Sequence, residues 1–196
     1  SSLMNACESI LGLSPYQGGK PIEELARELG LTKISKLASN ENPLGISSKV
    51  KEAINDSLSS INRYPDGNCF ELKKAIATKH NVTPEIISLG NGSNELLELI
   101  ARVFVSNQTD EVIFSQYAFV VYPLVTQALG ATAVVSPAKN YGHDLDSMLS
   151  MITTNTKLIF VANPNNPTGT LLTDKEVYNF LKQVPEGIPV VLDQAY

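Results

Sequence analysis

The sequence predicts an α/β fold with a mainly parallel sheet and helices on both of its faces. Short apolar segments, often rich in β-branched residues, alternate along the 196 residues with segments whose apolar residues recur at helical spacing. Strands that are buried on both faces have this continuously apolar character. Strand–helix alternation of this kind is typical of parallel sheets, whose ligands bind at the carboxyl ends of the strands.

The expected strands are short apolar runs that end at polar or turn-forming residues. They are residues 86–89, 112–114, 131–135, 158–162 and 190–193. Residues 1–45 are less regular and richer in turn-forming residues, so we expect an arm and a lead-in there rather than a domain.

The helices carry signals for their starts and ends. Pro21 stands where a first helical turn would begin, and Gly30 follows the last periodic residue of that helix. Val50, Ile54 and Leu58 give the next helix one apolar face. Two residue pairs have the spacing of a capping box, in which each side chain bonds the other residue's backbone N–H. These pairs are Asn68 with Glu71 and Thr173 with Glu176.

The composition is that of an ordinary soluble globular protein, with 43% hydrophobic residues, 18% charged residues and a net charge of -5. The acidic excess is spread along the chain, which argues against nucleic-acid binding. Without an apolar run of membrane-spanning length or a signal peptide, we expect a cytoplasmic protein. Cys7 and Cys69 are expected to be free thiols, and His80 and His143 to lie at the surface or at helix ends without a metal.

The segment GNGSNE, residues 90–95, follows the first expected strand and opens a helix expected over residues 96–105. Its glycines allow a tight turn, and the free amides of a helix start attract an anion such as a phosphate. A plain turn capped by Asn and Ser is the alternative. Glu95 stands where a dinucleotide-binding fingerprint has its third glycine, which argues against that class of cofactor.

Three further candidates follow or end expected strands. Phe119 lies in SQYAFVVYP, residues 115–123, where its ring could stack on a flat cofactor or pack in the core. Asn166 lies in NPNNPTG, residues 163–169, whose prolines and glycine fix the backbone and would hold an amide in place for a ligand. Asp193 ends the last strand, where a carboxylate needs a cation such as a protonated ring nitrogen, unless it caps a following helix.

Together these segments resemble the histidinol-phosphate aminotransferase family of fold-type I enzymes, which depend on pyridoxal 5'-phosphate (PLP). The resemblance covers residues 13–196 and includes SPYQGGKP at 14–21, LASNENPLG at 37–45 and NRYPD at 62–66. It implies that residues 46–196 are the front part of the large PLP-binding domain. It also implies transamination between L-histidinol phosphate and 2-oxoglutarate, in histidine biosynthesis, by a homodimer.

By the same resemblance, each candidate residue would hold one part of the cofactor. The phosphate would be bound by Gly92, Ser93 and Asn94, the ring face by Phe119, the phenolic oxygen by Asn166 and Tyr196, and the ring nitrogen by Asp193. Tyr64 would reach the cofactor phosphate of the other subunit, and Tyr16 would lie near the substrate.

The family attaches PLP through a lysine in a later Ser-Lys-containing segment and uses later arginines to bind the substrate. Lys157, Lys175 and Lys182 stand at a strand start and on an exposed helix, so none of them is nominated for this role. We therefore expect a fragment that lacks the Schiff-base lysine, the end of the large domain and the small C-terminal domain, and that is inactive alone.

Other functions stay open at this point. A threonine-phosphate decarboxylase or an aromatic amino acid aminotransferase would share the cofactor. A regulator that senses a ligand through an aminotransferase domain would carry a basic DNA-binding segment, and none precedes the fold in this sequence. A purely structural or interaction fragment is the remaining alternative.

Overall fold

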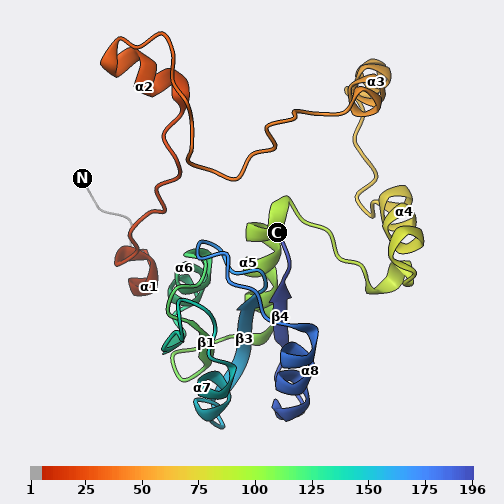
Figure 1. The fold of residues 1–196 in the computed structure, drawn as a ribbon. Coiled ribbons are helices and arrows are strands. Elements are labelled where there is room, and N and C mark those ends of the chain that lie inside the picture. The colour runs from red at the N-terminus through yellow and green to blue at the C-terminus, as the bar shows by residue number, and fades with distance from the viewer. Residues whose placement is uncertain (1–5) are drawn as a thin grey trace. The chain divides into compact units, whose positions relative to one another are not determined.

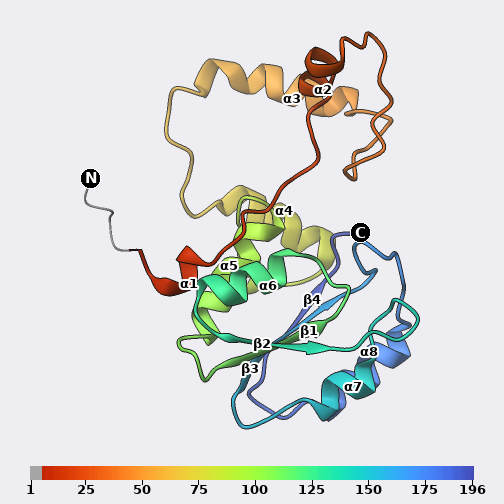
Figure 2. The ribbon, with the colours of Figure 1, turned by 90° about the vertical axis from the view of Figure 1, so that its left-hand side faces the viewer.

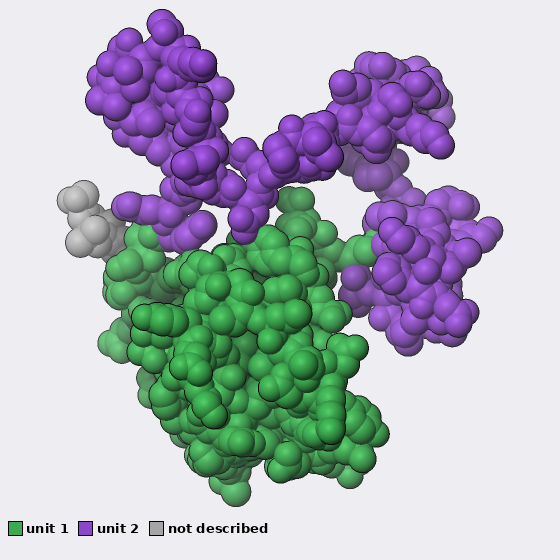
Figure 3. Space-filling view, viewed as in Figure 1, with its two compact units in different colours: residues 1–15, 89–196 green, residues 16–88 purple. Residues whose placement is uncertain are grey.

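A computed structural model describes residues 6–196, which form two compact units. Residues 6–15 and 89–196 make up the first unit, and residues 16–88 make up the second. Figure 1 shows the order of the elements along the chain, and Figure 3 distinguishes the two units by colour. The first unit contains the whole described sheet.

The first unit is built on a four-stranded parallel sheet, which confirms the predicted fold class. The strands lie side by side in the order β2-β1-β3-β4. Their bounds are β1 Glu111–Ser115, β2 Thr132–Ser136, β3 Thr156–Ala162 and β4 Val190–Asp193. These strands confirm the ones expected at 112–114, 131–135, 158–162 and 190–193.

Helices cover both faces of this sheet, as Figure 2 shows. On one face lie α5 (Gly92–Phe104) and α6 (Val121–Ala128). On the other lie α7 (Leu145–Ser150) and α8 (Asp174–Gln183). The short helix α1 (Glu8–Leu11) belongs to the same unit, and the hydroxyl of its Ser9 donates to the Ala128 carbonyl at 3.2 Å.

The central strand β3 contributes to two separate hydrophobic cores. Leu158, Phe160 and Ala162 pack with α5 and α6, whereas Ile159 and Val161 pack with α7 and α8. Successive side chains of a strand point to opposite faces, so a strand covered on both faces has no polar side. This is the physical reason for the unbroken apolar run that revealed β3 in the sequence.

The connections diverge between the neighbouring strands β1 and β3. After β1 the chain passes through α6 to β2 on one side, whereas after β3 it passes through α8 to β4 on the other side. Where neighbouring connections diverge in this way, the carboxyl ends of the strands border an open crevice in which ligands bind. The loop after β1, the loop after β3 and the end of β4 all meet this edge.

The second unit is helical, with α2 (Ile22–Leu29), α3 (Ser48–Ser57) and α4 (Phe70–His80). A 3-10 turn η1 (Leu58–Ser60) extends α3, and a second one, η2 (Pro84–Ile86), follows α4. The helix predicted between Pro21 and Gly30 is confirmed, and Gly30 ends it in the left-handed conformation at φ 64°. Within residues 6–196 no helix has both the length and the apolar character that a membrane span requires.

The strand predicted at residues 86–89 is wrong. Ile86 ends the 3-10 turn η2 and is 71% exposed, and the residues after it have no regular structure until α5 begins at Gly92. A strand forms only beside a partner, and none of the strands in the described sheet pairs with this segment. The local apolar pattern cannot supply that partner.

One predicted capping box is confirmed and the other is wrong. Thr173 and Glu176 bond each other's backbone N–H groups at the start of α8. Asn68 and Glu71 form no such pair, because the Asp66 carboxylate instead accepts the N–H of Phe70 at 3.0 Å. Its other oxygen accepts the Asn68 N–H at 2.9 Å, and these backbone bonds lower the pKa of Asp66.

His143 was expected at the surface or at a helix end. It does not lie at the surface, because the residue is only 7% exposed, but it directly precedes Asp144, the N-cap of α7. Its Nε2 lies 2.7 Å from the carbonyl oxygen of Ala162, so Nε2 carries the hydrogen. Its Nδ1 is buried and has no hydrogen-bond partner in the described part of the chain. Burial lowers the pKa of His143. Cys7 and Cys69 are free thiols, as predicted.

This environment predicts how stability depends on pH. Above the ordinary imidazole value of 6.5, His143 is neutral in the folded and the unfolded chain. Below that value the unfolded chain takes up the proton more readily, so the free energy of unfolding should fall as the pH decreases. We expect His143→Gln, which keeps an N–H donor but does not titrate, to make this fall shallower in urea unfolding curves.

The same substitution at His80, which is exposed at the end of α4, is the matched control. A His143→Gln protein whose unfolding free energy falls as steeply as that of the wild type would contradict the role assigned to burial.

Candidate active site

A small hollow opens at the carboxyl edge of the sheet, beside the ends of β3 and β4. Its lining contains polar, aromatic and apolar groups from segments far apart in the sequence: Ser93, Phe119, Ala162, Pro164, Asn166, Asp193, Ala195 and Tyr196. The structure therefore brings together most of the residues that the sequence singled out.

The start of α5 contributes Ser93 to this hollow. Gly92 adopts a φ of 79°, a backbone conformation that residues with a side chain rarely adopt, which explains the glycine. Its N–H donates to the Gly90 carbonyl at 3.0 Å, and the Glu95 carboxylate accepts the N–H of Asn91. The Ser93 hydroxyl and the amides of Ser93 and Asn94 are therefore the groups that α5 can offer to an anion.

The loop after β1 contributes Phe119, which is half-buried. Its ring meets that of Tyr122 edge-on, with centroids 6.1 Å apart and planes at 88°. Tyr122 in turn lies parallel to Phe160, at 4.6 Å and 3°. Phe119 therefore packs against this aromatic pair and also lines the hollow.

The loop after β3 is held by two asparagines that do not line the hollow. The Asn163 side chain accepts the Leu172 N–H at 2.8 Å and donates to the Leu172 carbonyl at 3.1 Å. The Asn165 side chain donates to the Tyr117 carbonyl at 3.0 Å and to the Thr168 hydroxyl at 2.8 Å. These bonds fix the loop that presents Asn166, whose Nδ2 lies 3.3 Å from the Tyr196 hydroxyl.

Asp193 ends β4 directly beside Ala162, its partner in the β3–β4 pairing. One carboxylate oxygen, Oδ2, accepts the Tyr122 hydroxyl at 2.7 Å, and the other, Oδ1, accepts the Ala195 N–H at 3.2 Å. No cationic side chain of the described residues forms an ion pair with it. A half-buried carboxylate with this surrounding is available to a cationic ligand group.

Some sequence-predicted residues are not brought to the hollow. Gly92 and Asn94 flank Ser93 but do not line it. Tyr16 and Tyr64 belong to the second unit, where Tyr16 is 57% exposed and Tyr64 is fully exposed.

Sequence reasoning missed Tyr122, whose side chain is completely buried and bonds the carboxylate. Its place three residues after Phe119, in the same strand-end segment, was the available signal. The structural roles of Asn163 and Asn165 were also missed, although both precede or follow a proline in a strand-end loop.

A larger hollow of about 340 Å³ lies between α7 and α8. It lies on the α7–α8 side of the sheet, and it is lined mainly by acidic, amide and aliphatic side chains. Its lining also includes an aromatic ring, carboxylates and amides, but none of the residues that the sequence assigned to a cofactor. Because ligands of parallel sheets bind at the carboxyl ends of the strands, we assign the active site to the smaller hollow.

The groups at the carboxyl edge suit one kind of ligand. A flat heteroaromatic ring could lie against Phe119 and meet Asp193 with a cationic nitrogen. Asn166 and Tyr196 could donate to an oxyanion on that ring, and the start of α5 could bind a phosphate.

Residues 32–196 match the protein family described as aminotransferase class I and II. Histidinol-phosphate aminotransferase 1 of Mannheimia succiniciproducens is 58% identical over 194 residues, which are 99% of this chain and 53% of that protein. Histidinol-phosphate aminotransferase 2 of Pasteurella multocida is 59% identical over 189 residues, which are 96% of this chain and 52% of that protein. The chain spans about half the length of the curated relatives that it matches.

The fold of this chain is also similar to those of solved aminotransferase structures. Histidinol-phosphate aminotransferase from Sinorhizobium meliloti, solved in complex with pyridoxal-5'-phosphate, matches with a TM-score of 0.88 and 26% identity over 100% of this chain and 52% of that chain. The histidinol-phosphate aminotransferase from Clostridium acetobutylicum matches with a TM-score of 0.71 and 28% identity, over 81% of this chain and 46% of that chain. From its sequence match and its fold, the chain belongs to the aminotransferase class I and II family.

Proposed function

We propose that this chain is part of a PLP-dependent enzyme that transfers an amino group between L-histidinol phosphate and 2-oxoglutarate in histidine biosynthesis. The observation that carries the proposal is the hollow at the carboxyl edge, where Phe119, Asn166, Asp193 and Tyr196 meet Ser93. The substrate rests on the names of relatives that are 58% and 59% identical, because a fold alone does not specify a substrate.

The groups around the hollow fit PLP in kind. PLP combines a flat ring, a basic ring nitrogen, an oxyanion and a phosphate. Phe119 offers a ring face. The Asn166 amide donates to the Tyr196 hydroxyl at 3.3 Å, which leaves a second amide hydrogen and the hydroxyl hydrogen as donors. Each oxygen of Asp193 accepts one hydrogen bond within the protein and retains a further lone pair for the ring nitrogen.

When bound, PLP supplies an electron sink for the bond that is broken at the substrate. The role of Asp193 is to hold a proton on the ring nitrogen, because an adjacent carboxylate favours the charged form of that nitrogen. Asn166 and Tyr196 donate to the phenolic oxygen and favour its anionic form. Phe119 and Ser93, with Gly92 and Asn94, anchor the ring face and the phosphate.

We further assign Tyr64 to the cofactor phosphate of the second subunit of a homodimer, and Tyr16 to the substrate. The complete exposure of the Tyr64 side chain in its own unit supports a contact outside that unit. A cytoplasmic location agrees with the free thiols of Cys7 and Cys69, since such thiols persist in reducing compartments.

We propose that the lysine that binds PLP covalently, and the arginines that bind the substrate, lie outside residues 1–196. Lys157 is exposed near the start of β3, at the opposite end of the strand from the hollow, and Lys175 and Lys182 are exposed on α8. None of these lysines lines the hollow at the carboxyl edge.

The substrate assignment is tested by supplying the full-length protein with PLP and alternative amino donors. We expect glutamate to form from L-histidinol phosphate and 2-oxoglutarate with a kcat/KM about a hundredfold above that for phenylalanine, because polar groups that bind a phosphate are left unpaired by a donor that lacks one. A preference for phenylalanine, or release of CO₂ from threonine phosphate, would instead support one of the related enzyme classes.

The role of Asp193 is tested by Asp193→Asn in the full-length protein. We expect PLP binding to persist and kcat to fall by about a hundredfold or more, because anchoring survives while the ring nitrogen loses its charge partner. Asp174→Asn, at the exposed first residue of α8, is the matched control. Near-normal turnover of Asp193→Asn would mean that Asp193 has only a structural role.

The role of Tyr64 is tested by mixing two inactive variants, Tyr64→Ala and Asp193→Asn, under conditions that exchange subunits. A hybrid dimer would contain one site built from the unchanged Asp193 of one subunit and the unchanged Tyr64 of the other. Since half of randomly mixed dimers are hybrids, we expect about a quarter of wild-type activity. If activity stays at the level of the unmixed variants, Tyr64 contributes to the active site of its own subunit or to no active site.

A further inference from the structure

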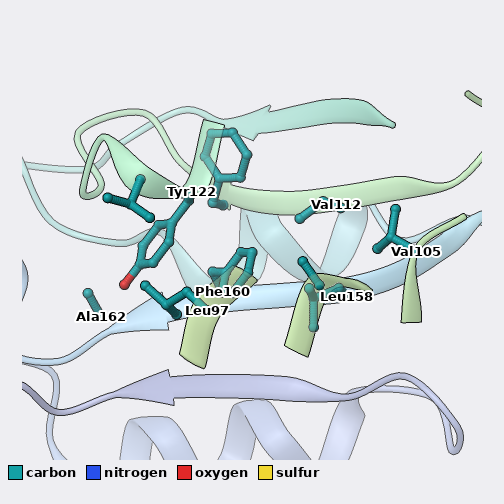
Figure 4. Packing of buried hydrophobic residues seen from close by; sticks show 10 residues of the cluster. Leu97, Val105, Val112, Tyr122, Leu158, Phe160 and Ala162 are labelled. Carbon is teal, nitrogen blue, oxygen red and sulfur yellow. The ribbon is translucent and has the colours of Figure 1, made fainter. Parts of the chain in front are cut away.

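Tyr122 connects the groups assigned to the cofactor. It is the second residue of α6 and is buried with 0% of its side chain exposed. Its hydroxyl donates to Asp193 on β4, its ring lies flat on Phe160 of β3, and its edge meets Phe119 after β1. In Figure 4 the hydroxyl oxygen, drawn in red, points toward Ala162 at the end of β3.

The hydrogen bond between Tyr122 and Asp193 has a fixed direction. A carboxylate can only accept, and at 2.7 Å the contact has the length of a charge-assisted O–H···O bond. Burial, followed by the bond to Asp193, raises the pKa of Tyr122, so the phenol keeps its proton throughout the working pH range. The stacked ring has no room to turn away, so the donor stays in place.

The carboxylate is thereby held from two sides. Oδ2 is bonded by Tyr122 and Oδ1 by the Ala195 N–H, a longer contact at 3.2 Å that comes from the exposed end of the chain segment after β4. The shorter bond, from the buried and rigid partner, is the one that decides the orientation of the carboxylate.

We propose that Tyr122 is a positioning residue that orients the Asp193 carboxylate toward the ring nitrogen of the cofactor. This inference rests on the proposed function. The alternative is that Tyr122 is only a core residue whose hydroxyl found the nearest acceptor. The two cases differ in what removal of the hydroxyl does, because a core role resides in the ring and a positioning role resides in the O–H group.

The test uses the full-length enzyme loaded with PLP and the variant Tyr122→Phe, which keeps the ring and its stacking. We expect kcat to fall about tenfold while KM changes by less than about twofold, as for loss of one hydrogen bond to a charged group. The midpoint of the pH titration of the bound cofactor's visible absorption should also shift. Tyr178→Phe, at an exposed tyrosine of α8, is the matched control and should change neither quantity.

A double-mutant cycle separates a role through Asp193 from a general effect. If Tyr122 acts by orienting Asp193, the Tyr122→Phe/Asp193→Asn protein should be no slower than Asp193→Asn alone. The proposal would be overturned if the double variant were about tenfold slower in kcat than Asp193→Asn alone. It would also be overturned if Tyr122→Phe left both kcat and the absorption midpoint unchanged. If Tyr122→Phe fails to fold, 4-fluorophenylalanine at position 122 replaces it, and 4-aminophenylalanine, which restores a donor, should recover the rate.

The wild-type enzyme distinguishes failure of this inference from failure of the proposed function. A wild type that shows no visible absorption with PLP and forms no glutamate contradicts the proposed function itself. A wild type that binds PLP and transaminates, beside a Tyr122→Phe variant that behaves identically, contradicts the positioning role alone.

Discussion

The parallel pairing of β1, β3 and β4 is the constraint on which the rest of the molecule depends. Because all three strands run in the same direction, the chain leaves each of them at the same edge of the sheet. The register that sets Ala162 beside Asp193 brings the ends of β3 and β4 level with each other. Residues as far apart in sequence as Phe119 and Asp193 can then face one hollow, and neither needs a long or strained loop to do so.

The same arrangement explains how a carboxylate can stay at the end of a half-buried strand. Removing a carboxylate from water is unfavourable unless donors compensate it. Tyr122 and the Ala195 N–H provide two donors, and neither of them is a cation. The site therefore keeps negative charge available to a ligand instead of neutralising it within the protein. An internal lysine or arginine would have stabilised Asp193 more strongly but would have competed with the ring nitrogen that we assign to it.

The sequence predicts the sheet well and the finer contacts poorly, for identifiable reasons. The runs at β1 and β3 are apolar without interruption, and burial on both faces is the simplest cause of such a pattern. The false strand at residues 86–89 has a similar local pattern but no partner, and local sequence does not encode partners. Phe119 and Asn166 were nominated because each follows a strand end, and Asp193 because it ends a strand. The role of Tyr122 and the burial of His143 were not predicted, because their hydrogen-bond partners lie 71 and 19 positions away.

The central claim is that the cofactor's ring nitrogen meets Asp193 at the carboxyl edge of the sheet. A crystal structure of the full-length protein with PLP bound tests it most directly. The account predicts an Asp193 carboxylate oxygen about 2.8 Å from the ring nitrogen, with Phe119 against the ring face and the phosphate at the start of α5. PLP bound in the hollow between α7 and α8, or bound at the carboxyl edge with its ring nitrogen away from Asp193, would contradict it.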